Sequence, residues 1–265
     1  MLRDFQNLGQ ISWRALHVWR RDLLVYRATW WTNLLPPLLE PVLYLLAFGA
    51  GIGRLVGEVT DQGARVGYLP FIAPGLVAVA IMFWSFYETL YGSFVRMYYQ
   101  KTFDAILATP LSLEDVLVGE ILWGATKSVV TASVMLGVIS LFGVLAWPSS
   151  WWVLPLAALG GLLFASLGMC FTAVCPTIDS FNLPIFLLVF PMFLFSGTFF
   201  PVDMLPGWAL RVAWALPLTH VASLLRAATL NRPPAHLAAS VGYLVGMAAL
   251  LFVTSLVLMR RRLIR

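Results

Sequence analysis

Charged residues are scarce in this sequence, and their scarcity excludes the ordinary soluble domain. Asp, Glu, Lys and Arg make up 11% of the 265 residues, whereas a soluble domain usually carries about 25%. Hydrophobic residues make up 60% and come in blocks that are too long for a soluble core. A helix of roughly 20 apolar residues spans a bilayer because it satisfies its own backbone hydrogen bonds there. The composition therefore predicts an all-α, polytopic membrane protein.

The residues and motifs that catalysis would need are also missing. Residues 119–124 have the glycine spacing that opens a phosphate-binding loop, but Ala125 follows where a lysine is needed, and the segment is an apolar helix. There is no Gly-x-Ser-x-Gly nucleophile motif. Candidate metal ligands are few and lack metal-site spacing: Cys170, Cys175, His17, His220 and His236. We therefore expect no catalytic residue, no metal, no bound cofactor and no ATPase motif in this chain.

Six apolar segments are long enough to cross a bilayer and should form a single domain over 1–265. They are about 32–53, 70–97, 116–146, 151–175, 181–200 and 237–259. The fifth is interrupted by Pro184, Pro191 and Gly197, which predicts a broken or re-entrant helix. The semi-polar stretch 201–234 should form short external or re-entrant helices.

The first 31 residues predict an amphipathic helix that lies at the membrane surface. Read as a helix, one side carries Leu8, Ser12, Ala15, Leu16, Trp19, Leu23, Tyr26 and Trp30. The other side carries Arg14, Arg20, Arg21 and Arg27. Apolar and basic faces of this kind suit the headgroup boundary. The alternative is a solvated helix that contacts a cytosolic partner.

The basic residues set the predicted orientation. The net charge of +5 comes from residues at the two ends and beside the apolar blocks, which indicates topology and not nucleic-acid binding. One side collects Arg3, Arg14, Arg20, Arg21, Arg27, Arg96, Lys101 and the arginines at 260–262 and 265. The opposite side receives Arg54, Arg65, Arg211, Arg226 and Arg232. Both termini should therefore be cytoplasmic.

Small residues recur at four-residue spacing and predict close helix packing. They are Gly49 with Gly53, Ala157 with Gly161 and Ala165, and Gly242 with Gly246. Packing within one chain and packing between two copies both remain open.

Four charges fall within the predicted spans: Glu40, Glu88, Glu120 and Lys127. A charge at a helix centre costs on the order of 2.5–3.5 kcal/mol on insertion scales, so such residues usually face protein or water. At 1.5 Å per residue, Glu88 lies roughly 13 Å and Lys127 roughly 16 Å from the cytoplasmic ends of their antiparallel spans. We therefore expect a Glu88–Lys127 ion pair that lowers the insertion cost of both; alternatively, one of the two lines a translocation path.

Residues 100–111 predict a short amphipathic helix on the cytoplasmic side. Phe103, Ile106 and Leu107 form an apolar stripe beside Lys101 and Asp104, and the pair Thr109-Pro110 ends the helix. Such a helix either lies on the bilayer or docks a partner.

The segment from Phe86 to Met97, its continuation over Gln100–Val116, and the residues Gly119, Glu120 and 125–127 resemble the ABC-2 type exporter permeases. Within them the chain is most similar to the NodJ nodulation-factor (lipo-chitooligosaccharide) exporter permease family. Later stretches fit as well: Phe195–Asp203, Leu205–Trp208 and Leu216–His220. The resemblance covers nearly the whole chain.

This resemblance implies a connecting helix around Arg20, Arg21 and Arg27, six spans, a coupling helix and short external helices. It also implies a homodimer, or a closely similar partner, joined to two separate ATPase subunits that use ATP and magnesium. The coupling helix would carry Gln100, Lys101, Phe103, Asp104, Leu107, Thr109 and Pro110. The expected function is export of an amphipathic substrate, such as a glycolipid or lipo-oligosaccharide, across the inner membrane.

Three other functions remain open: drug export, a passive channel or scaffold, and a membrane-embedded enzyme that modifies lipid or sugar. The enzyme would use Glu40, Glu88 and Asp203 as acids and would need them gathered near one polar pocket.

Overall fold

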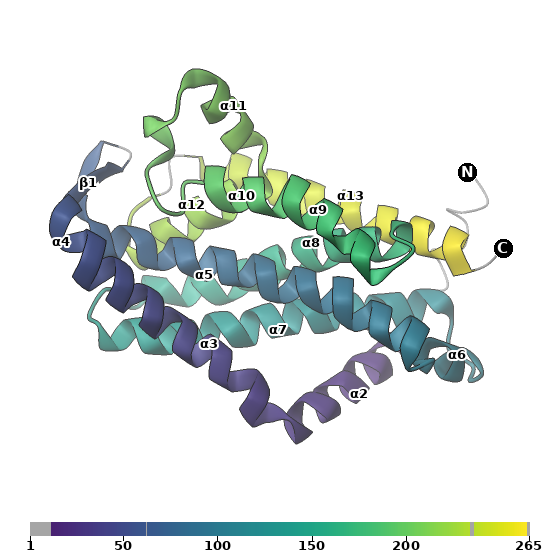
Figure 1. The fold of residues 1–265 in the computed structure, drawn as a ribbon. Helices are drawn as coiled ribbons and strands as arrows, with labels where there is room; N and C mark the ends of the chain where they lie inside the picture. Colours follow the sequence, from purple (N-terminus) through teal and green to yellow (C-terminus); the bar gives the residue numbers. More distant parts are fainter. Residues whose placement is uncertain (1–11, 62, 234–235, 264–265) are drawn as a thin grey trace.

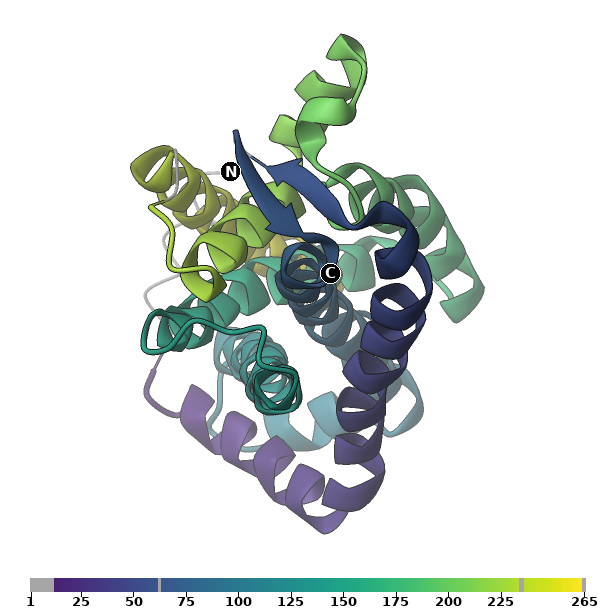
Figure 2. The same cartoon turned by 90° about the vertical axis from the view of Figure 1, so that its left-hand side faces the viewer.

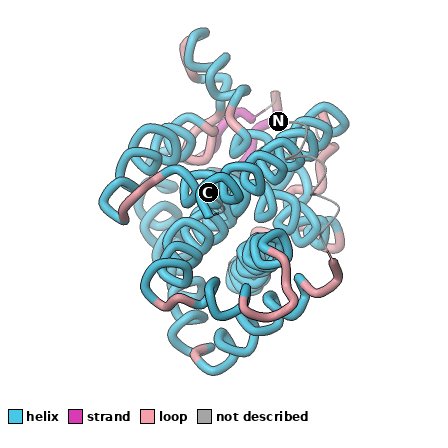
Figure 3. The backbone as a smooth tube through the Cα atoms, turned by 90° about the vertical axis from the view of Figure 1, so that its right-hand side faces the viewer, coloured by secondary structure: helices cyan, strands magenta, loops and turns pink. Residues whose placement is uncertain are grey.

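The computed structural model describes residues 12–61, 63–233 and 236–263, and their fold is almost entirely helical (Figure 3). In its first half the elements are α2 Ala15–Ala28, α3 Trp30–Tyr44, the π-helix η2 Leu45–Ile52, α4 Gly53–Val56, strands β1 Glu58–Asp61 and β2 Ala64–Gly67, α5 Tyr68–Tyr87, the π-helices η3 Glu88–Gly92 and η4 Val95–Tyr99, α6 Thr102–Leu107 and α7 Leu113–Leu141. In its second half they are the 3₁₀ helix η5 Ser149–Trp152, α8 Val153–Val174, the 3₁₀ helix η6 Ile178–Phe181, α9 Asn182–Pro184, the π-helix η7 Ile185–Val189, α10 Phe190–Phe195, the 3₁₀ helix η8 Val202–Met204, α11 Gly207–Ala215, α12 Pro217–Thr229 and α13 Leu237–Leu263.

Helix α5 lies at the centre, with α3, α7, α8 and α12 packed around it (Figure 2). Its side chains are apolar on all faces and are buried along most of its length, as expected of a helix surrounded by others. The long helices run roughly side by side, so the molecule has two ends: α6 and the end of α13 lie at one, and α4 with the β1–β2 hairpin at the other (Figure 1).

The all-α, polytopic class is confirmed. In the part of the chain that the structure describes, five helices are long and apolar enough to cross a membrane: Tyr68–Tyr99, Leu113–Leu141, Ser149–Val174, Ile178–Phe195 and Leu237–Leu263. They correspond to the second to sixth predicted spans. The first predicted span is helical too, as α3, η2 and α4 in succession, but it is not among these five, and its crossing stays a prediction.

In the described part of the region 201–234, the α-helices α11 and α12 meet at a bend of 84°. By length and apolarity this pair would count as a sixth, broken span. The expected short helices are therefore present, and their depth in the membrane stays a prediction. The small antiparallel hairpin of β1 and β2, between the first two predicted spans, was not expected.

Two of the predicted small-residue motifs mark close packing within the chain. A Cβ at Gly161 would lie 1.9 Å from the Ser128 hydroxyl, so α7 and α8 touch only because that side chain is absent. The hydroxyl donates a 2.9 Å hydrogen bond to Ala157 of α8. A Cβ at Gly49 would meet Leu69 at 2.9 Å. By contrast, Gly242 and Gly246 face open space, so that motif packs against nothing in the described chain.

Candidate functional site

Helix α2 packs flat on α7 at the α6 end of the molecule (Figure 1). A Cβ at Gly119 would lie 2.6 Å from Cβ of Val18 and 2.9 Å from the Ala15 carbonyl oxygen, so the contact requires glycine. The buried face of α2 consists of Ala15, Val18 and Asp22. Of the predicted apolar face, Ala15 lies in this contact, Trp19 and Leu23 are half-buried, and Leu16 is exposed, so its position at the membrane surface stays a prediction.

Beneath this contact lies a cluster of six charged side chains, three acidic and three basic. We call it the charge cluster: Arg21, Asp22, Glu88, Arg96, Glu120 and Lys127. They come from α2, from the η3–η4 end of the first long span, and from α7. Charges held away from water are stable only when they are paired and hydrogen-bonded, and this set is neutral overall.

Glu120 and Arg96 form the centre of the charge cluster. The Glu120 side chain is fully buried. Arg96 binds it through Nε, at 3.0 and 2.9 Å from the two carboxylate oxygens, and through Nη2 in a fork. The Ser93 hydroxyl donates a further bond of 2.7 Å, and Arg21 lies 3.5 Å away. Glu120 thus ties α7 to both α2 and η4.

Glu88 has three partners. Lys127 Nζ lies 2.7 Å from Oε2, which is the ion pair that the depths of the two residues predicted. Arg96 Nη1 lies 3.0 Å from Oε1, and the Trp123 indole donates to the same oxygen at 3.2 Å. Arg96 therefore bridges Glu88 and Glu120, which makes the predicted pair part of a larger network.

The π-helical turns explain why residues eight apart meet. In a regular α-helix, positions 88 and 96 would point about 80° apart. A π-turn accommodates one extra residue and restores a common face. Gly92 lies between them, where a Cβ would come within 2.9 Å of a Glu88 carboxylate oxygen and 3.3 Å of the Arg96 guanidinium. The carbonyl of Thr89, within η3, accepts a 2.8 Å bond from the Thr172 hydroxyl of α8.

Asp22 is the strained member of the charge cluster. Burial and, after it, the negative charge of Glu120 raise the pKa of its carboxyl to about 6, although the positive charges of Arg96 and Arg21 oppose the shift. Arg21 donates to one carboxylate oxygen, while Oδ2 is buried with no partner among the described residues. A proton on Asp22 would relieve the repulsion from Glu120.

The predicted cytoplasmic helix is α6, and most of its predicted contact residues are on the surface. The exposed ones are Gln100, Lys101, Asp104, Leu107, Thr109 and Pro110. Phe103 differs: it is 1% exposed and lies in the core, so it holds α6 on the fold and offers no surface to a partner. This is a correction to the apolar stripe, whose only well-exposed member is Leu107.

Helices α2 and α6 are joined at their ends. Arg14 donates a 2.6 Å bond to the Pro110 carbonyl, just after α6. The backbone N–H of Ser12 donates a 2.7 Å bond to Asp115 in the first turn of α7. Asp115 also completes a capping box with Ser112, which fixes where α7 begins. The exposed helix is therefore connected to α2 at one end and to the charge cluster, through η4, at the other.

The other predicted site residues fall into three groups. Arg20 and Arg27 are exposed on α2, whereas Arg21 turns inward to the charge cluster. Glu40 on α3 makes no ion pair among the described residues and lies beside Trp84. Asp203 is exposed in η8, so Glu40, Glu88 and Asp203 do not gather at one pocket, as a membrane-embedded enzyme would need.

Two arginines assigned to topology are in fact buried partners. Arg96, counted as cytoplasmic, belongs to the charge cluster, and Arg226, counted on the opposite side, is 7% exposed. Asp22 was missed altogether, although it follows Ala15 by seven residues and Val18 by four, a spacing that puts all three on one face of α2. Arg3, Leu8 and Arg265 lie outside the described residues.

Known proteins are similar to this chain along most of its length. Residues 15–230 match the family described as ABC-2 type transporter. Nodulation protein J of Rhizobium leguminosarum bv. viciae is 38% identical over 97% of each chain, and that of Rhizobium meliloti (strain 1021) is 37% identical over 95% of each. The inner membrane transport permease YadH of Escherichia coli (strain K12) is 25% identical over 89% of this chain and 90% of its own.

Proposed function

Because the chain belongs to the ABC-2 type transporter family, we propose that it is the transmembrane permease subunit of an ATP-driven exporter. It would lie in the inner membrane with both termini in the cytoplasm and act as a dimer with two ATPase subunits. ATP and magnesium would be used by those subunits, since this sequence carries no phosphate-binding loop. The substrate would be an amphiphile such as a glycolipid or lipo-oligosaccharide.

The observation that carries this proposal is the unbroken connection from α6 to the charge cluster. α6 follows η4 directly, and η4 carries Arg96, which holds Glu88 and Glu120. A push on the exposed face of α6 would therefore move η4 against α7, and Arg14 would carry α2 along. Packed helices transmit such displacements because their contacts switch between distinct arrangements and do not deform gradually.

The Glu88–Lys127 pair also fits a structural role better than a role in lining the substrate translocation path, because both charges are paired inside one subunit. Each charge in the pair has a partner within 3.0 Å. A substrate-contacting residue would need to exchange these partners for water or substrate, which costs several kcal/mol per buried ion.

The test is to co-purify the chain with an ATPase from a neighbouring reading frame and to measure assembly and permease-dependent ATP hydrolysis. Asp104→Arg reverses an exposed charge on α6 and should weaken assembly or uncouple hydrolysis while leaving the unfolding of the isolated chain unchanged. Phe103→Ala should do the opposite: it empties a core position, so the isolated chain should lose about 3–5 kcal/mol of stability. Full coupling and normal assembly in Asp104→Arg and Leu107→Ala would refute α6 as the coupling element.

The substrate class needs its own assay. The reconstituted complex should move a fluorescent lipo-oligosaccharide into the lumen of inside-out vesicles only with ATP, and an ATPase-dead partner is the control. Movement of hydrophobic drugs with no response to lipo-oligosaccharide would support the drug-export alternative instead.

A further inference from the structure

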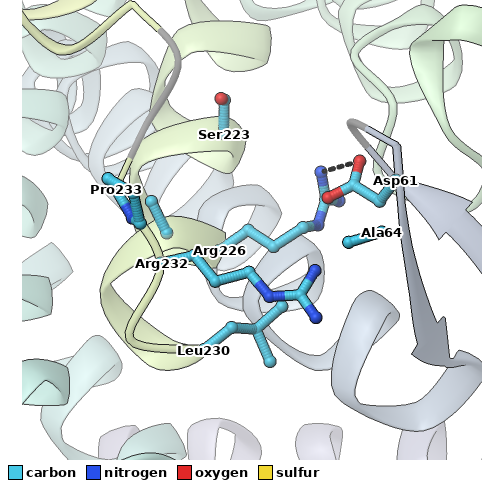
Figure 4. A pocket seen from close by; sticks show the side chains of 8 residues that line it. Asp61, Ala64, Ser223, Arg226, Leu230, Arg232 and Pro233 are labelled. Carbon is cyan, nitrogen blue, oxygen red and sulfur yellow. Dashed lines mark ion pairs between the residues drawn. The ribbon is translucent and has the colours of Figure 1, made fainter.

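A second polar feature lies at the opposite end of the molecule, between the β1–β2 hairpin and α12. It is a cavity of about 170 Å³, many times the roughly 15 Å³ that one water molecule needs. Its polar lining consists of Asp61, Ser223, Arg226 and Arg232, and the rest is apolar. Figure 4 shows both arginine side chains extending from α12 and the turn after it toward the hairpin.

Arg226 is held rigidly in the wall of this cavity. Its Nε donates to the Phe71 carbonyl at 3.2 Å and its Nη2 to the Gly197 carbonyl at 2.9 Å. The guanidinium lies 3.9 Å from the centre of the Phe71 ring. These contacts fix the plane of the guanidinium and leave Nη1 as its outward-facing donor.

The positive charge of the cavity is not neutralised by the described residues. Nη1 of Arg226 lies 3.8 Å from Asp61, which is close enough for an ion pair but too far for a hydrogen bond. Arg232, half-buried and extending beside Arg226, makes no side-chain hydrogen bond or ion pair with any described residue. Two guanidinium groups thus face one carboxylate, and the lining carries a net charge of +1.

We propose that this cavity binds a phosphate-type oxyanion, held between Arg226 and Arg232. Guanidinium groups present paired N–H donors that match the oxygens of a phosphate. A buried cation with a free donor gains more from such a ligand than an exposed one, because little water competes for it. Ser223 also lines the cavity.

The apolar part of the lining indicates what the oxyanion is attached to. Ala64, Ala227, Leu230 and Pro233 would cover the carbon atoms next to a phosphate ester. Free phosphate and the head group of a phospholipid share the chemistry that the arginines recognise. This site goes beyond export and does not depend on it, since binding requires neither ATP nor the partner subunits.

The experiment measures binding to the purified full chain in a neutral maltoside detergent. One arm titrates inorganic phosphate by calorimetry, and the other titrates short-chain phosphatidylglycerol, with a neutral diacylglycerol as the blank. Arg232→Gln should weaken binding about 10- to 100-fold, because one charge-assisted donor group is lost. Asp61→Asn should tighten it, since the competing carboxylate is removed.

Arg211→Gln is the matched control, because Arg211 is an exposed arginine on the neighbouring α11 and does not line the cavity. Binding of both ligands with this pattern supports an open oxyanion site, and binding of phosphatidylglycerol alone supports a lipid head group as the source. Equal affinity in Arg232→Gln and the unmodified chain, or no binding of either ligand, would overturn the proposal. None of these results depends on ATP-driven export, so the two proposals fail separately.

Discussion

Replacing Glu120 with Gln tests the charge cluster at its centre. Arg96 binds Glu120 at about 3 Å, and two unit charges at that distance attract by about 5.5 kcal/mol at an effective dielectric constant near 20. Two effects reduce the loss: Arg96 keeps Glu88 at 3.0 Å, and the repulsion between Glu120 and Asp22 disappears. We therefore expect Glu120→Gln to lower the free energy of unfolding by about 3 kcal/mol, at the lower end of values for broken buried pairs.

The reciprocal change and the double variant make the prediction specific. Arg96→Gln should cost more, about 3–5 kcal/mol, because it leaves the buried Glu120 carboxylate with Arg21 at 3.5 Å as its remaining cation and the Ser93 hydroxyl as a neutral donor. The double variant restores neutrality, with Glu88 still on Lys127 and Asp22 still on Arg21. Its loss should therefore be smaller than the sum of the single losses by about 2–3 kcal/mol.

The assay is equilibrium unfolding in mixed micelles of maltoside and dodecyl sulfate, followed by tryptophan fluorescence. Glu58→Gln in the exposed part of β1 is the control and should stay within about 0.5 kcal/mol of the unmodified chain. Losses that simply add, or a loss below about 1 kcal/mol for Glu120→Gln, would show that the cluster is not coupled as its geometry indicates.

The same geometry shows why a charge swap is a poor test of the Glu88–Lys127 pair. Lysine at position 88 would place a second cation against Arg96, which now lies 3.0 Å from the Glu88 carboxylate. The protein with the two charges exchanged should therefore be destabilised even though Glu88 and Lys127 form a pair in the unmodified chain. Joint neutralisation, Glu88→Gln with Lys127→Met, removes both charges and leaves Arg96 on Glu120, so it should be milder than Glu88→Gln alone.

Three further predictions concern close contacts and protonation. Gly92→Ala should lower the unfolding free energy by about 1–3 kcal/mol, because its Cβ would reach a Glu88 oxygen at 2.9 Å. The control is Gly137→Ala, which has nothing within 4 Å of its Cβ and should be neutral or stabilising; equal effects of the two changes would contradict the contact. Gly119→Leu should detach α2 from α7, and a cysteine pair placed across that contact should then lose its cross-linking while the rest of the fold persists. The pKa of Asp22 is raised from 3.8 to about 6, so the folded state binds the proton more tightly and stability falls as pH rises from about 4 to 6. Asp22→Asn should abolish that pH dependence and raise the free energy of unfolding at pH 7, measured by chemical unfolding, by up to about 3 kcal/mol. An unchanged slope of stability against pH would assign the pH dependence to another group.

Hydropathy and spacing were enough to predict the helical class, five of the spanning helices within a few residues, and the Glu88–Lys127 contact. These features depend on local composition and on the depth of two residues along antiparallel helices. Arg96 was predicted only as a topology signal, because a basic residue near the end of an apolar block ordinarily indicates the cytoplasmic side. Its pairing with Glu88 and Glu120 depends on which side of the helix it faces.

The direction in which the Arg96 side chain points depends in turn on the π-turns, which no periodicity in the sequence revealed. A regular helix directs positions 88 and 96 apart, so sequence reasoning paired Glu88 with Lys127 and left Glu120 without a partner. A glycine at position 92 was the available signal, since a residue without a side chain between an acid and a base eight apart leaves room for them to meet. It follows that η3 and η4 are held in shape by the charges that they bring together, and that a displacement of α6 large enough to rewind either turn must also separate Arg96 from Glu88.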